Sequence, residues 1–455
     1  MDITQQNKNY RYANTFRRLL RRNARPNIRK ILSRTHPADI ANIFAFFPLD
    51  DKITLLNCTN DNEIRAEIIT NLQLHNAAEL ISRLETKLAV DIICEMSGDD
   101  QADLLGELDE AHAAEIIAAM PVEESRDLEN LLNYHEKSAG GIMNPDVLAI
   151  HSDSTIAEAI KTVQEATDVD MFFYLYVVDE NKSLIGVLSL RHLVTSKPNI
   201  LVKNIMNPNV VSVRTDEDQE DVARLVTRYD FLAIPVVDDT NTLVGAVSVD
   251  DVIDVISEEA TEDILKMAGA GDAPTDYSSL MKQTLSRLPW LFAALLGGLV
   301  VALIINYFND TLIKFIALAG FIPVISGMAG NVGTQSLAIV VRGLATRRIN
   351  VRQIWKVIGN EILVGMVLGL IYGVLLGAVG YWQFLGNTPL AINLGIAIGI
   401  STISAMTIST LLAAGMPLFF AKLNIDPAVA TGPFVTTTTD IIGVTAYFLI
   451  VNVMI

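Results

Sequence analysis

The C-terminal part of the chain, residues 281–455, contains neither histidine nor cysteine. Imidazole and thiolate ligands are therefore missing from this part, which disfavours a dedicated Zn²⁺ or Cu⁺ site there. The same absence gives no support to a serine–histidine hydrolase. No glycine-rich phosphate loop is evident, which argues against pumping driven by ATP hydrolysis. Cys58 and Cys94 are too few and too far apart for a disulfide framework or a zinc cluster, and we expect both to be reduced.

Charge is distributed unevenly along the chain. The full sequence of 455 residues has a formal net charge of −18 at pH 7. Residues 1–280 contain 25 basic and 48 acidic residues, whereas residues 281–455 contain nine basic and four acidic residues. The second part also carries long apolar runs, as the hydrocarbon core of a bilayer requires. We therefore expect an acidic water-soluble part followed by a part embedded in a lipid bilayer, and the net acidity does not favour a nucleic-acid partner.

The first 34 residues depart from this acidity. They contain ten Lys or Arg residues and one acid. No apolar stretch follows them directly, so a signal peptide is not expected. A solvated basic tail, a contact with anionic lipid and a contact with the acidic part behind it all remain open for this extension.

The water-soluble part divides into two regions with different periodicity. Residues 35–138 contain short amphipathic segments such as "NAAELISRL" and "KLAVDIICEM", and their recurrence at about 20 residues predicts a solenoid-like stack of helical hairpins. Residues 139–257 contain a repeat, since "IMNP" at 142–145 returns at 205–208, and each copy continues with a helix, two strands and a closing helix. The duplicated α/β unit, at 139–200 and 201–257, resembles a pair of cystathionine-β-synthase-type (CBS) modules.

Five apolar segments follow a connecting helix expected over residues 258–288. Each reaches the length of about 20 residues that is needed to span a bilayer. The arginine-rich segment 342–352 and Lys422 lie between spans, so the positive-inside rule places them, the N-terminus and the soluble domains on the cytoplasmic side of the inner membrane, with the C-terminus outside. The expected spans of this domain, 289–455, are about 289–308, 312–341, 354–382, 390–420 and 427–452.

The few polar residues of the apolar segments are candidate ion ligands, because an ionisable group at bilayer depth is costly without water, a partner or an ion. Gly432, Thr436 and Asp440 share one helical face, and Asp426 is rotated from Asp440 by only about 40°. Asn331, in "GMAGNVGTQS", adds an amide oxygen. Such an oxygen-lined stripe suits a hard cation. A buried Asp440 that only bonds neighbouring helices, and a glycine motif that only packs helices, are the alternatives.

A second set of carboxylates crowds two segments of the water-soluble part, 216–230 and 249–263. In the second segment, four acids at positions i, i+3, i+7 and i+11 lie on one helical face: Asp251, Asp254, Glu258 and Glu262. Like charges at these spacings repel, and counter-cations would relieve the repulsion. A solvated acidic surface is the alternative.

The chain as a whole resembles the MgtE family of Mg²⁺ channels. The resemblance rests on "GMAGNVGTQS", "DPAVATGPFVTTTTD" and "VDDVIDVISEEATED" together with the domain order. It implies a multidomain membrane protein with an all-α superhelical N domain, tandem α/β CBS domains, a connecting (plug) helix and an all-α domain of five transmembrane helices. It further implies a homodimer with a pore on the two-fold axis, in which Asp440 binds hydrated Mg²⁺, Asn331 lines the pore and Asp426 lies at its cytoplasmic mouth.

The resemblance also implies regulatory sites in the cytosolic part. Family members bind ATP in the CBS pair, and Arg191 and Phe231 would contact it by position. An acid of the N domain takes part in binding Mg²⁺, and the choice among Asp99, Asp100 and Asp103 stays open. The other cytosolic Mg²⁺ ligands map onto Asp218, Glu220, Asp230, Asp251, Asp254, Glu259, Glu262 and Asp263.

The expected function is import of Mg²⁺ down its electrochemical gradient through a pore that cytosolic Mg²⁺ closes. A channel for another divalent cation such as Co²⁺ or Mn²⁺ is one alternative. A membrane receptor that senses nucleotide without conducting ions is another. An enzyme is not expected, because no acid–base or nucleophile set is evident.

Overall fold

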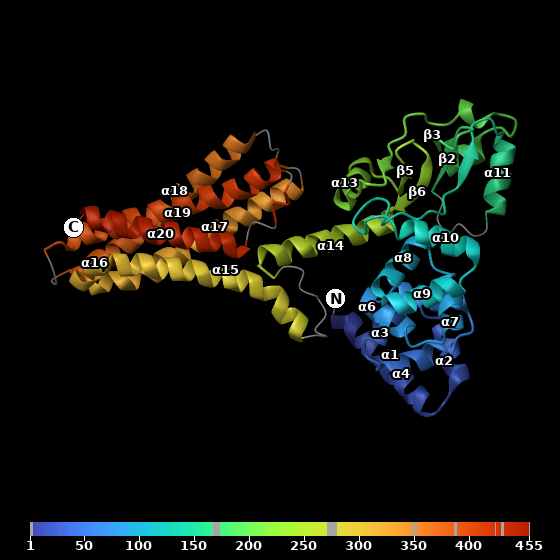
Figure 1. Ribbon diagram of the computed structural model, residues 1–455, viewed down its shortest axis with the longest axis horizontal. Coiled ribbons are helices and arrows are strands. Elements are labelled where there is room, and N and C mark those ends of the chain that lie inside the picture. The colour runs from blue at the N-terminus through green and yellow to red at the C-terminus, as the bar shows by residue number, and fades with distance from the viewer. Residues whose placement is uncertain are drawn as a thin grey trace. The chain divides into compact units, whose positions relative to one another are not determined.

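The computed structural model describes residues 3–166, 173–270, 280–346, 348–349, 353–385, 389–423, 425–428 and 432–454. The chain forms two compact units, Met1–Ser257 and Glu258–Ile455 (Figure 1). The first unit contains the short helices and the strands, and the second contains the long apolar helices.

The first unit begins with a stack of helices, ten of them in the part of the chain that the structure describes. Local signals set their ends: Pro26 and Pro37 lie in the first turns of two helices, where a missing N–H costs nothing. The Asp109 carboxylate accepts a hydrogen bond from the backbone N–H of His112 and caps another. The helices are α1 (Ile3–Arg21), α2 (Arg25–Leu32), α3 (Pro37–Phe44), α4 (Leu49–Leu56), α5 (Asn62–Thr70), α6 (Leu74–Ile81), α7 (Thr86–Ile93), α8 (Gly98–Glu107), α9 (Glu110–Ala119) and α10 (Val122–Leu131).

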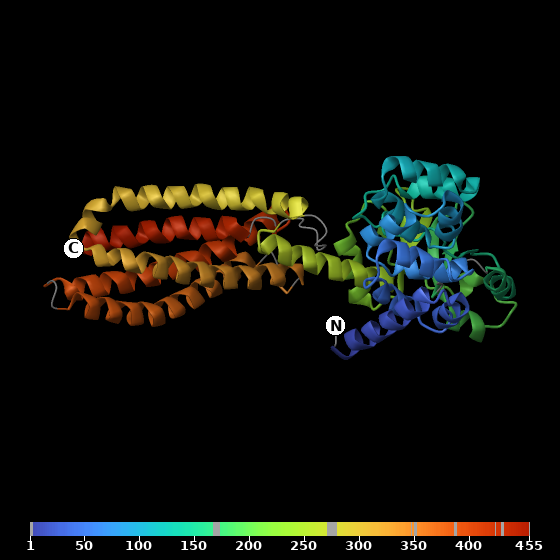
Figure 2. The ribbon, with the colours of Figure 1, turned by 90° about the horizontal axis from the view of Figure 1, so that it is seen from below.

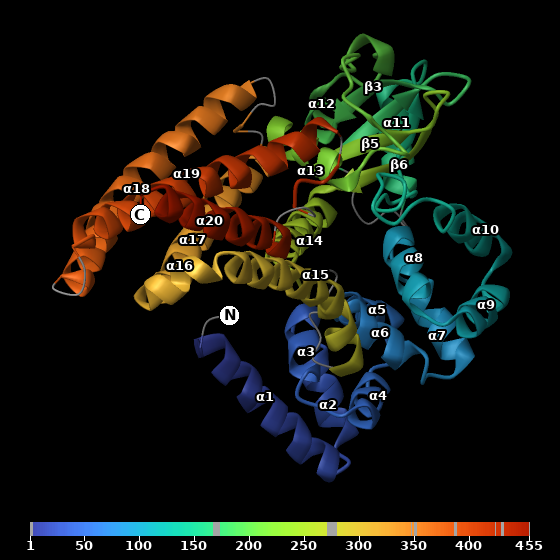
Figure 3. The ribbon, with the colours of Figure 1, turned by 60° about the vertical axis from the view of Figure 1, so that its left-hand side comes forward.

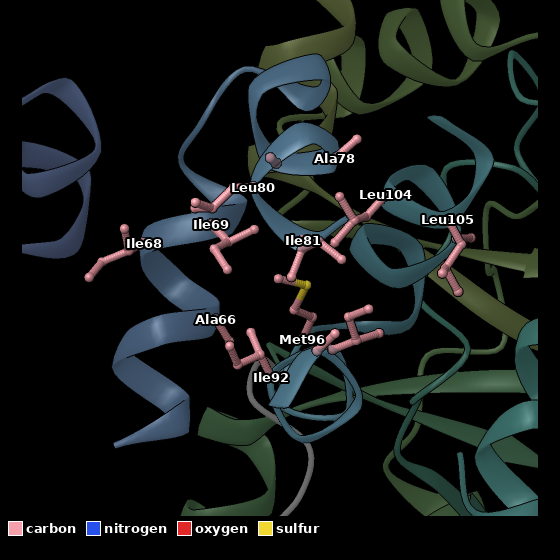
Figure 4. Packing of buried hydrophobic residues seen from close by; sticks show 14 of the residues in the cluster. Ala66, Ile68, Ile69, Ala78, Leu80, Ile81, Ile92, Met96, Leu104 and Leu105 are labelled. Atoms are coloured by element: carbon pink, nitrogen blue, oxygen red, sulfur yellow. The ribbon is translucent and has the colours of Figure 1, made fainter. Parts of the chain in front are cut away.

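The apolar faces of these helices share one core. The helices follow one another along the stack (Figure 3), and alternate helices pack together, with contacts from α3 to α5, α5 to α7 and α7 to α9. Figure 4 shows Ile69, Ile81 and Met96 directed into the space between helices, and all three are buried. The core continues into the second CBS copy through buried residues such as Val222 and Ile234. The helical stack and this copy are therefore one packed body.

The basic extension is built into the stack as α1 and α2. Phe16, Ile28 and Leu32 are buried in the shared core. Arg17 donates a hydrogen bond of 2.7 Å to the carbonyl of Phe46. The described residues of this extension thus form an additional helical layer that carries an exposed basic surface.

Two sheets of the same topology follow the helices. The strand orders are β1-β2-β3 and β4-β5-β6. In each sheet the middle strand pairs in parallel with the first strand and antiparallel with the third. A register shift recurs at the equivalent position of the middle strand. The first copy comprises β1 (Ala149–His151), α11 (Ile156–Glu165), β2 (Tyr174–Val178), β3 (Leu184–Ser189) and α12 (Leu190–Thr195), followed by the short helix η1 (Val202–Asn204). The second copy comprises β4 (Val213–Arg214), α13 (Gln219–Tyr229), β5 (Ala233–Val237) and β6 (Leu243–Ser248), and leads into α14 (Val249–Met267).

The repeated "IMNP" motif exchanges contacts between the two copies. Asn144 pairs with Ala246 of the second copy through two backbone hydrogen bonds of 2.9 Å. Asn207 pairs with Val187 of the first copy in the same way. Each motif lies over a strand glycine of the other copy: a Cβ on Gly245 would lie 2.8 Å from the sulfur of Met143. The repeat therefore builds one symmetric pair rather than two independent modules.

The second unit consists of the end of α14 and a bundle of long apolar helices that lie side by side (Figure 2). Within the described residues, five of these helices are long and apolar enough to cross a membrane. The most buried is α19, which contacts α17, α18 and α20, whereas α15 packs on α20 and is the most exposed. The elements are α15 (Leu280–Tyr307), α16 (Asn309–Lys314), η2 (Ile316–Phe321), α17 (Ile322–Ala345), α18 (Ile354–Phe384), α19 (Ala391–Lys422) and α20 (Gly432–Met454).

Glycines bring α18 and α19 into backbone contact. A Cβ on Gly373 would lie 2.7 Å from the carbonyl oxygen of Gly399, and one on Gly395 would lie 2.7 Å from that of Gly377. Small residues at such crossings let membrane helices approach closely. The predicted fold class is confirmed: a helical N domain, two α/β CBS domains and five long apolar helices.

Candidate ion-binding sites

An acidic cavity of about 810 Å³ lies between the helical stack and the CBS copies of the first unit. One wall comes from α5 and α8, and the other from the strands and the start of α14. The N-domain acids on its wall are Asp99 and Asp100, whereas Asp103 lies outside it on the exposed side of α8. The carboxylates that line the cavity are Glu67, Glu95, Asp99, Asp100, Asp146, Asp250, Asp251 and Asp254.

Burial and repulsion from neighbouring acids raise the pKa values of three of these residues, Asp99, Asp100 and Asp251. The pKa of Asp251 rises to about 7, because of burial first and the charge of Asp99 second. Burial, and then the charge of Asp100, raises the pKa of Asp99 to about 6. Burial also raises the pKa of Asp100, although Ser97 Oγ donates a 2.8 Å hydrogen bond to its carboxylate. Negative charge in this cavity is therefore under-compensated.

The donor set of the cavity fits a hard divalent cation. The Oδ1 atom of Asp99 is buried and finds no hydrogen-bond partner among the residues that the structure describes. An orphaned carboxylate oxygen at such a place is an available ligand, and oxygen-only donors suit Mg²⁺. Across the described ranges of the chain, no three His, Cys, Asp or Glu side chains already form a metal-binding cluster. The oxygens face one cavity, but they are not gathered on one point.

Three predicted ligands lie elsewhere, on α13. The Asp218 side chain caps the start of this helix by accepting a 2.8 Å hydrogen bond from the N–H of Glu220. Asp230 ends the helix in the left-handed conformation, with φ of 54°. Glu220 lies 3.6 Å from the guanidinium of Arg224. The structure therefore gives these acids local roles and does not bring them to the acidic cavity.

A second acidic cluster lies in the second unit, where the end of α14 meets the segment before α20. Burial, and then the charges of Asp426 and Glu259, raises the pKa of Asp263 to about 6. The ammonium of Lys266 lies 2.8 Å from Asp426 Oδ2 and also contacts the carboxylate of Glu262. Burial of this ammonium works to lower its pKa, but the hydrogen bonds to Asp426 and Glu262 outweigh burial and raise it.

Asp440 meets a partner on α17. The hydroxyl of Ser326 donates a hydrogen bond to the Asp440 carboxylate, which is half-buried within the bundle. Ser326 was not expected from the sequence, because a serine in an apolar segment carries no sign of which helix it will face. This hydrogen bond brings a carboxylate and a hydroxyl oxygen together between two membrane helices.

The other predicted pore residues occupy different surroundings. Gly432 is buried beneath the end of α14, and a Cβ there would lie 2.8 Å from the carbonyl oxygen of Met267. The Thr436 hydroxyl donates to the carbonyl of Pro433 at 3.1 Å, within its own helix. Asn331 is exposed on the surface of the single chain. Only part of the predicted stripe therefore faces the point where Asp440 and α17 meet.

The glycines of "GMAGNVGTQS" differ in their surroundings. A Cβ on Gly333 would collide with Ser409 of α19, whose hydroxyl donates a 2.6 Å hydrogen bond to the carbonyl of Ala329. Nothing lies within 4 Å of a Cβ built on Gly327 or Gly330. Within one chain, only the third glycine of this motif serves close helix packing.

The predicted nucleotide contacts lie apart from the acidic cavity. Arg191 is exposed on α12, and Phe231 stacks on Tyr229 with ring centroids 5.3 Å apart. Neither residue lines the acidic cavity.

Lys266 was not predicted from the sequence as a partner of the acids Glu262 and Asp426. The signal was available, since Lys266 follows Glu262 by one helical turn, the favourable order for an ion pair on a helix. Its contact with Asp426, 160 positions further along the chain, needed the tertiary structure.

Comparison with known proteins matches the helical N domain, the CBS pair and most of the membrane part. Family models match residues 35–137 (MgtE intracellular N domain), residues 139–198 and 202–258 (CBS domain) and residues 322–450 (MgtE, divalent cation transporter). The magnesium transporter MgtE of Bacillus subtilis is 40% identical over 331 residues, which cover 72% of each chain. The magnesium transporter MgtE of Thermus thermophilus is 40% identical over 332 residues, again 72% of each chain.

Solved structures resemble the water-soluble part. The cytosolic domain of the Mg²⁺ channel MgtE in complex with ATP superimposes with a TM-score of 0.52 at 36% identity, covering 53% of this chain and 99% of that one. The soluble part of a magnesium transporter gives a TM-score of 0.52 at 30% identity, covering 55% and 99%. The multi-pass architecture with an intracellular N domain and the resemblance seen in the sequence are both confirmed. The chain belongs to the MgtE family of divalent cation transporters, a family of transporters and not of enzymes.

Proposed function

We propose that this chain imports Mg²⁺ across the inner membrane through its helical bundle, and that its intracellular acids close the pathway when cytosolic Mg²⁺ is high. The observation that carries the proposal is the Asp440 carboxylate on a membrane helix, held by Ser326. A carboxylate at this depth is costly unless water, a partner or an ion compensates it. Mg²⁺ prefers oxygen ligands and keeps part of its water shell, which suits a small oxygen-lined site.

The pathway is proposed to form between two copies of the chain. Asn331 and Thr334 are exposed on the single chain although they lie in a membrane helix. Gly327 and Gly330 next to them leave open space above their Cα atoms. A polar and narrow helix face of this kind is unfavourable toward lipid, and contact with a second copy around a water-filled axis would satisfy it.

The acidic cavity is proposed as the sensor. Burial first, and neighbouring acids second, raise the pKa values of Asp99 and Asp100 on α8 and Asp251 on α14, so negative charge on these three carboxylates is unfavourable. Bound Mg²⁺ would supply the positive charge that this cavity lacks. Without it, repulsion favours separation of α8 from α14. A ligand shifts such an equilibrium only if it binds the compact state better than the separated one.

The driving force for entry comes from the membrane potential. Moving one charge across 100 mV is worth about 2.3 kcal/mol, and a divalent ion gains about twice that. No energy source within the protein is needed for import down this gradient.

The decisive experiment is a patch recording of the full chain with internal Mg²⁺ varied. We expect Mg²⁺ currents that fall as internal Mg²⁺ rises. Currents that ignore internal Mg²⁺ would remove the sensor from the proposal. If liposomes containing the purified chain showed no Mg²⁺-dependent flux but bound nucleotide tightly, a non-conducting receptor would replace the channel. Competition with Co²⁺ and Mn²⁺ in uptake assays separates the remaining transport functions.

A second function, nucleotide binding by the CBS pair, is favoured by the relative whose cytosolic domain was solved with ATP. We propose Arg191 and Phe231 as contacts, since one offers a guanidinium to phosphate and the other an aromatic face to a base. Titration calorimetry of the purified full chain with ATP, compared with an Arg191→Ala variant, tests this assignment. Unchanged affinity in that variant would exclude Arg191.

A further inference from the structure

The last turn of α14 carries a lysine at a place surrounded by acids. The Lys266 side chain is only 20% exposed, and its ammonium contacts Asp426 at 2.8 Å and Glu262 of its own helix. Asp426 is held in turn by the N–H of Ala428 at 2.8 Å. One ammonium therefore joins the end of α14 to the segment that leads into α20.

Backbone and apolar contacts fix the same end of α14. Gly269, with φ of +69°, ends the helix in a left-handed conformation, and Ala270 N–H donates back to the carbonyl of Leu265 at 2.9 Å. Met267 packs against a buried apolar cluster that includes Val435 of α20. The end of α14 therefore packs on α20 through apolar contacts, and Lys266 adds an ion pair with Asp426.

Several charges meet at this end of α14. Four carboxylates influence the local field, and the Lys266 ammonium contacts two of them. The carboxylates are Glu259, Glu262, Asp263 and Asp426. Three of them are residues that the family resemblance assigned to Mg²⁺ on the connecting helix. In this chain, an internal ammonium already neutralises part of that acidic set.

We propose that Lys266 is a built-in cation that holds the end of α14 against the α19–α20 segment without any metal. The inference rests on the proposed function, because it gives the closed pathway a baseline that does not need Mg²⁺. Mg²⁺ binding at the sensor then needs to supply less free energy for closure. Closure therefore occurs at a lower cytosolic Mg²⁺ concentration than it would without this ammonium. Lys266 is a positioning residue, since it acts through Asp426 and not on the transported ion.

Lys266→Met tests the idea, because it keeps the aliphatic stem and removes the ammonium. Lys422→Met is a matched control: Lys422 is exposed, lies four positions before Asp426, and makes no ion pair in the described part of the chain. Lys266→Arg keeps the charge and should restore wild-type behaviour. Combining Lys266→Met with Asp426→Asn completes a double-mutant cycle, in which coupled residues give a non-additive result.

The first readout needs no ion flux. Hydrogen exchange of the full chain in lipid nanodiscs, with EDTA present, reports opening at the last turn of α14. We expect exchange there to be about two- to fivefold faster in Lys266→Met, the range for loss of a partly exposed ion pair. It should stay unchanged in Lys422→Met and Lys266→Arg. Equal exchange in Lys266→Met and the wild type would overturn the proposal, whatever the protein transports.

The second readout is the internal Mg²⁺ concentration at half-closure. It should rise by about two- to fivefold in Lys266→Met, in line with the same ion pair. Half-closure at an unchanged concentration would also overturn the proposal. A wild-type protein that does not close with Mg²⁺ would instead contradict the proposed function, and the exchange measurement would still decide whether Lys266 holds the helix.

Discussion

Replacing Asp251 with asparagine should make the first unit more stable when Mg²⁺ is absent. The pKa of Asp251 is raised from 3.8 to about 7, and at about 1.36 kcal/mol per unit this corresponds to about 4 kcal/mol of unfavourable charge burial at pH 8. The amide keeps a weaker hydrogen bond with Ser248, which loses about 1–2 kcal/mol relative to a charged acceptor. We expect a net gain of about 2 kcal/mol in the free energy of unfolding.

The sign of the pH dependence follows from proton binding. Between the unfolded pKa near 4 and the folded pKa of about 7, the folded state binds more protons than the unfolded state. Wild-type stability therefore falls as the pH rises through this window and levels off above it. The amide of the Asp251→Asn variant has no proton to exchange, so the advantage of the variant should be largest at pH 8 and shrink toward zero near pH 4.

Urea unfolding followed by circular dichroism measures both effects on a fragment of residues 1–257, the first unit. This unit has its own core, and the corresponding parts of relatives have been solved separately. Asp254→Asn is the matched control, because Asp254 lies on the same helix and lines the same cavity but is exposed. Asp254→Asn should change the free energy of unfolding by no more than about 0.5 kcal/mol, as surface substitutions usually do.

Adding Mg²⁺ should make the wild type more stable than the Asp251→Asn variant. If the wild type binds Mg²⁺ in the acidic cavity, it gains about 2.7 kcal/mol at 100 times the dissociation constant, and Asp251→Asn should gain much less. A variant that is less stable than the wild type without Mg²⁺, or that gains equally from Mg²⁺, would refute the view that under-compensated charge makes this cavity a cation site.

Three further outcomes are expected. Asp440→Ala should abolish uptake in Mg²⁺-starved cells while the protein still reaches the membrane by immunoblot; normal uptake would remove Asp440 from the pathway. Gly399→Leu should lower the free energy of unfolding of the detergent-solubilised protein by about 2 kcal/mol or more, because a Cβ there would lie 2.9 Å from the carbonyl oxygen of Gly373. Gly415→Ala should leave this free energy unchanged, because nothing lies within 4 Å of a Cβ built on Gly415. Closure by internal Mg²⁺ should weaken between pH 8 and pH 6, since Asp251 takes up a proton near pH 7; identical dose–response curves at both pH values would contradict this.

The fold class was predictable because it follows from composition and short-range periodicity. Apolar runs with few charges predict membrane helices without any knowledge of their neighbours. The "IMNP" duplication predicted two equal α/β copies, and the structure adds the reason for the motif: Asn144 and Asn207 pair with the opposite copy. That exchange depends on contacts between residues far apart in the sequence, such as Asn144 and Ala246, which a local pattern does not contain.

The sequence by itself determined which residues are able to bind a cation, since carboxylates in an apolar helix or in a crowded acidic segment stand out by type and spacing. Only the tertiary structure decided which of them meet. It sorted one list of acids into a cavity around Asp251, residues with local roles on α13 and a cluster partly neutralised by Lys266. The reason is physical: charge is a property of each residue, whereas burial and partnership depend on long-range packing that brings Lys266 and Asp426 together across 160 positions.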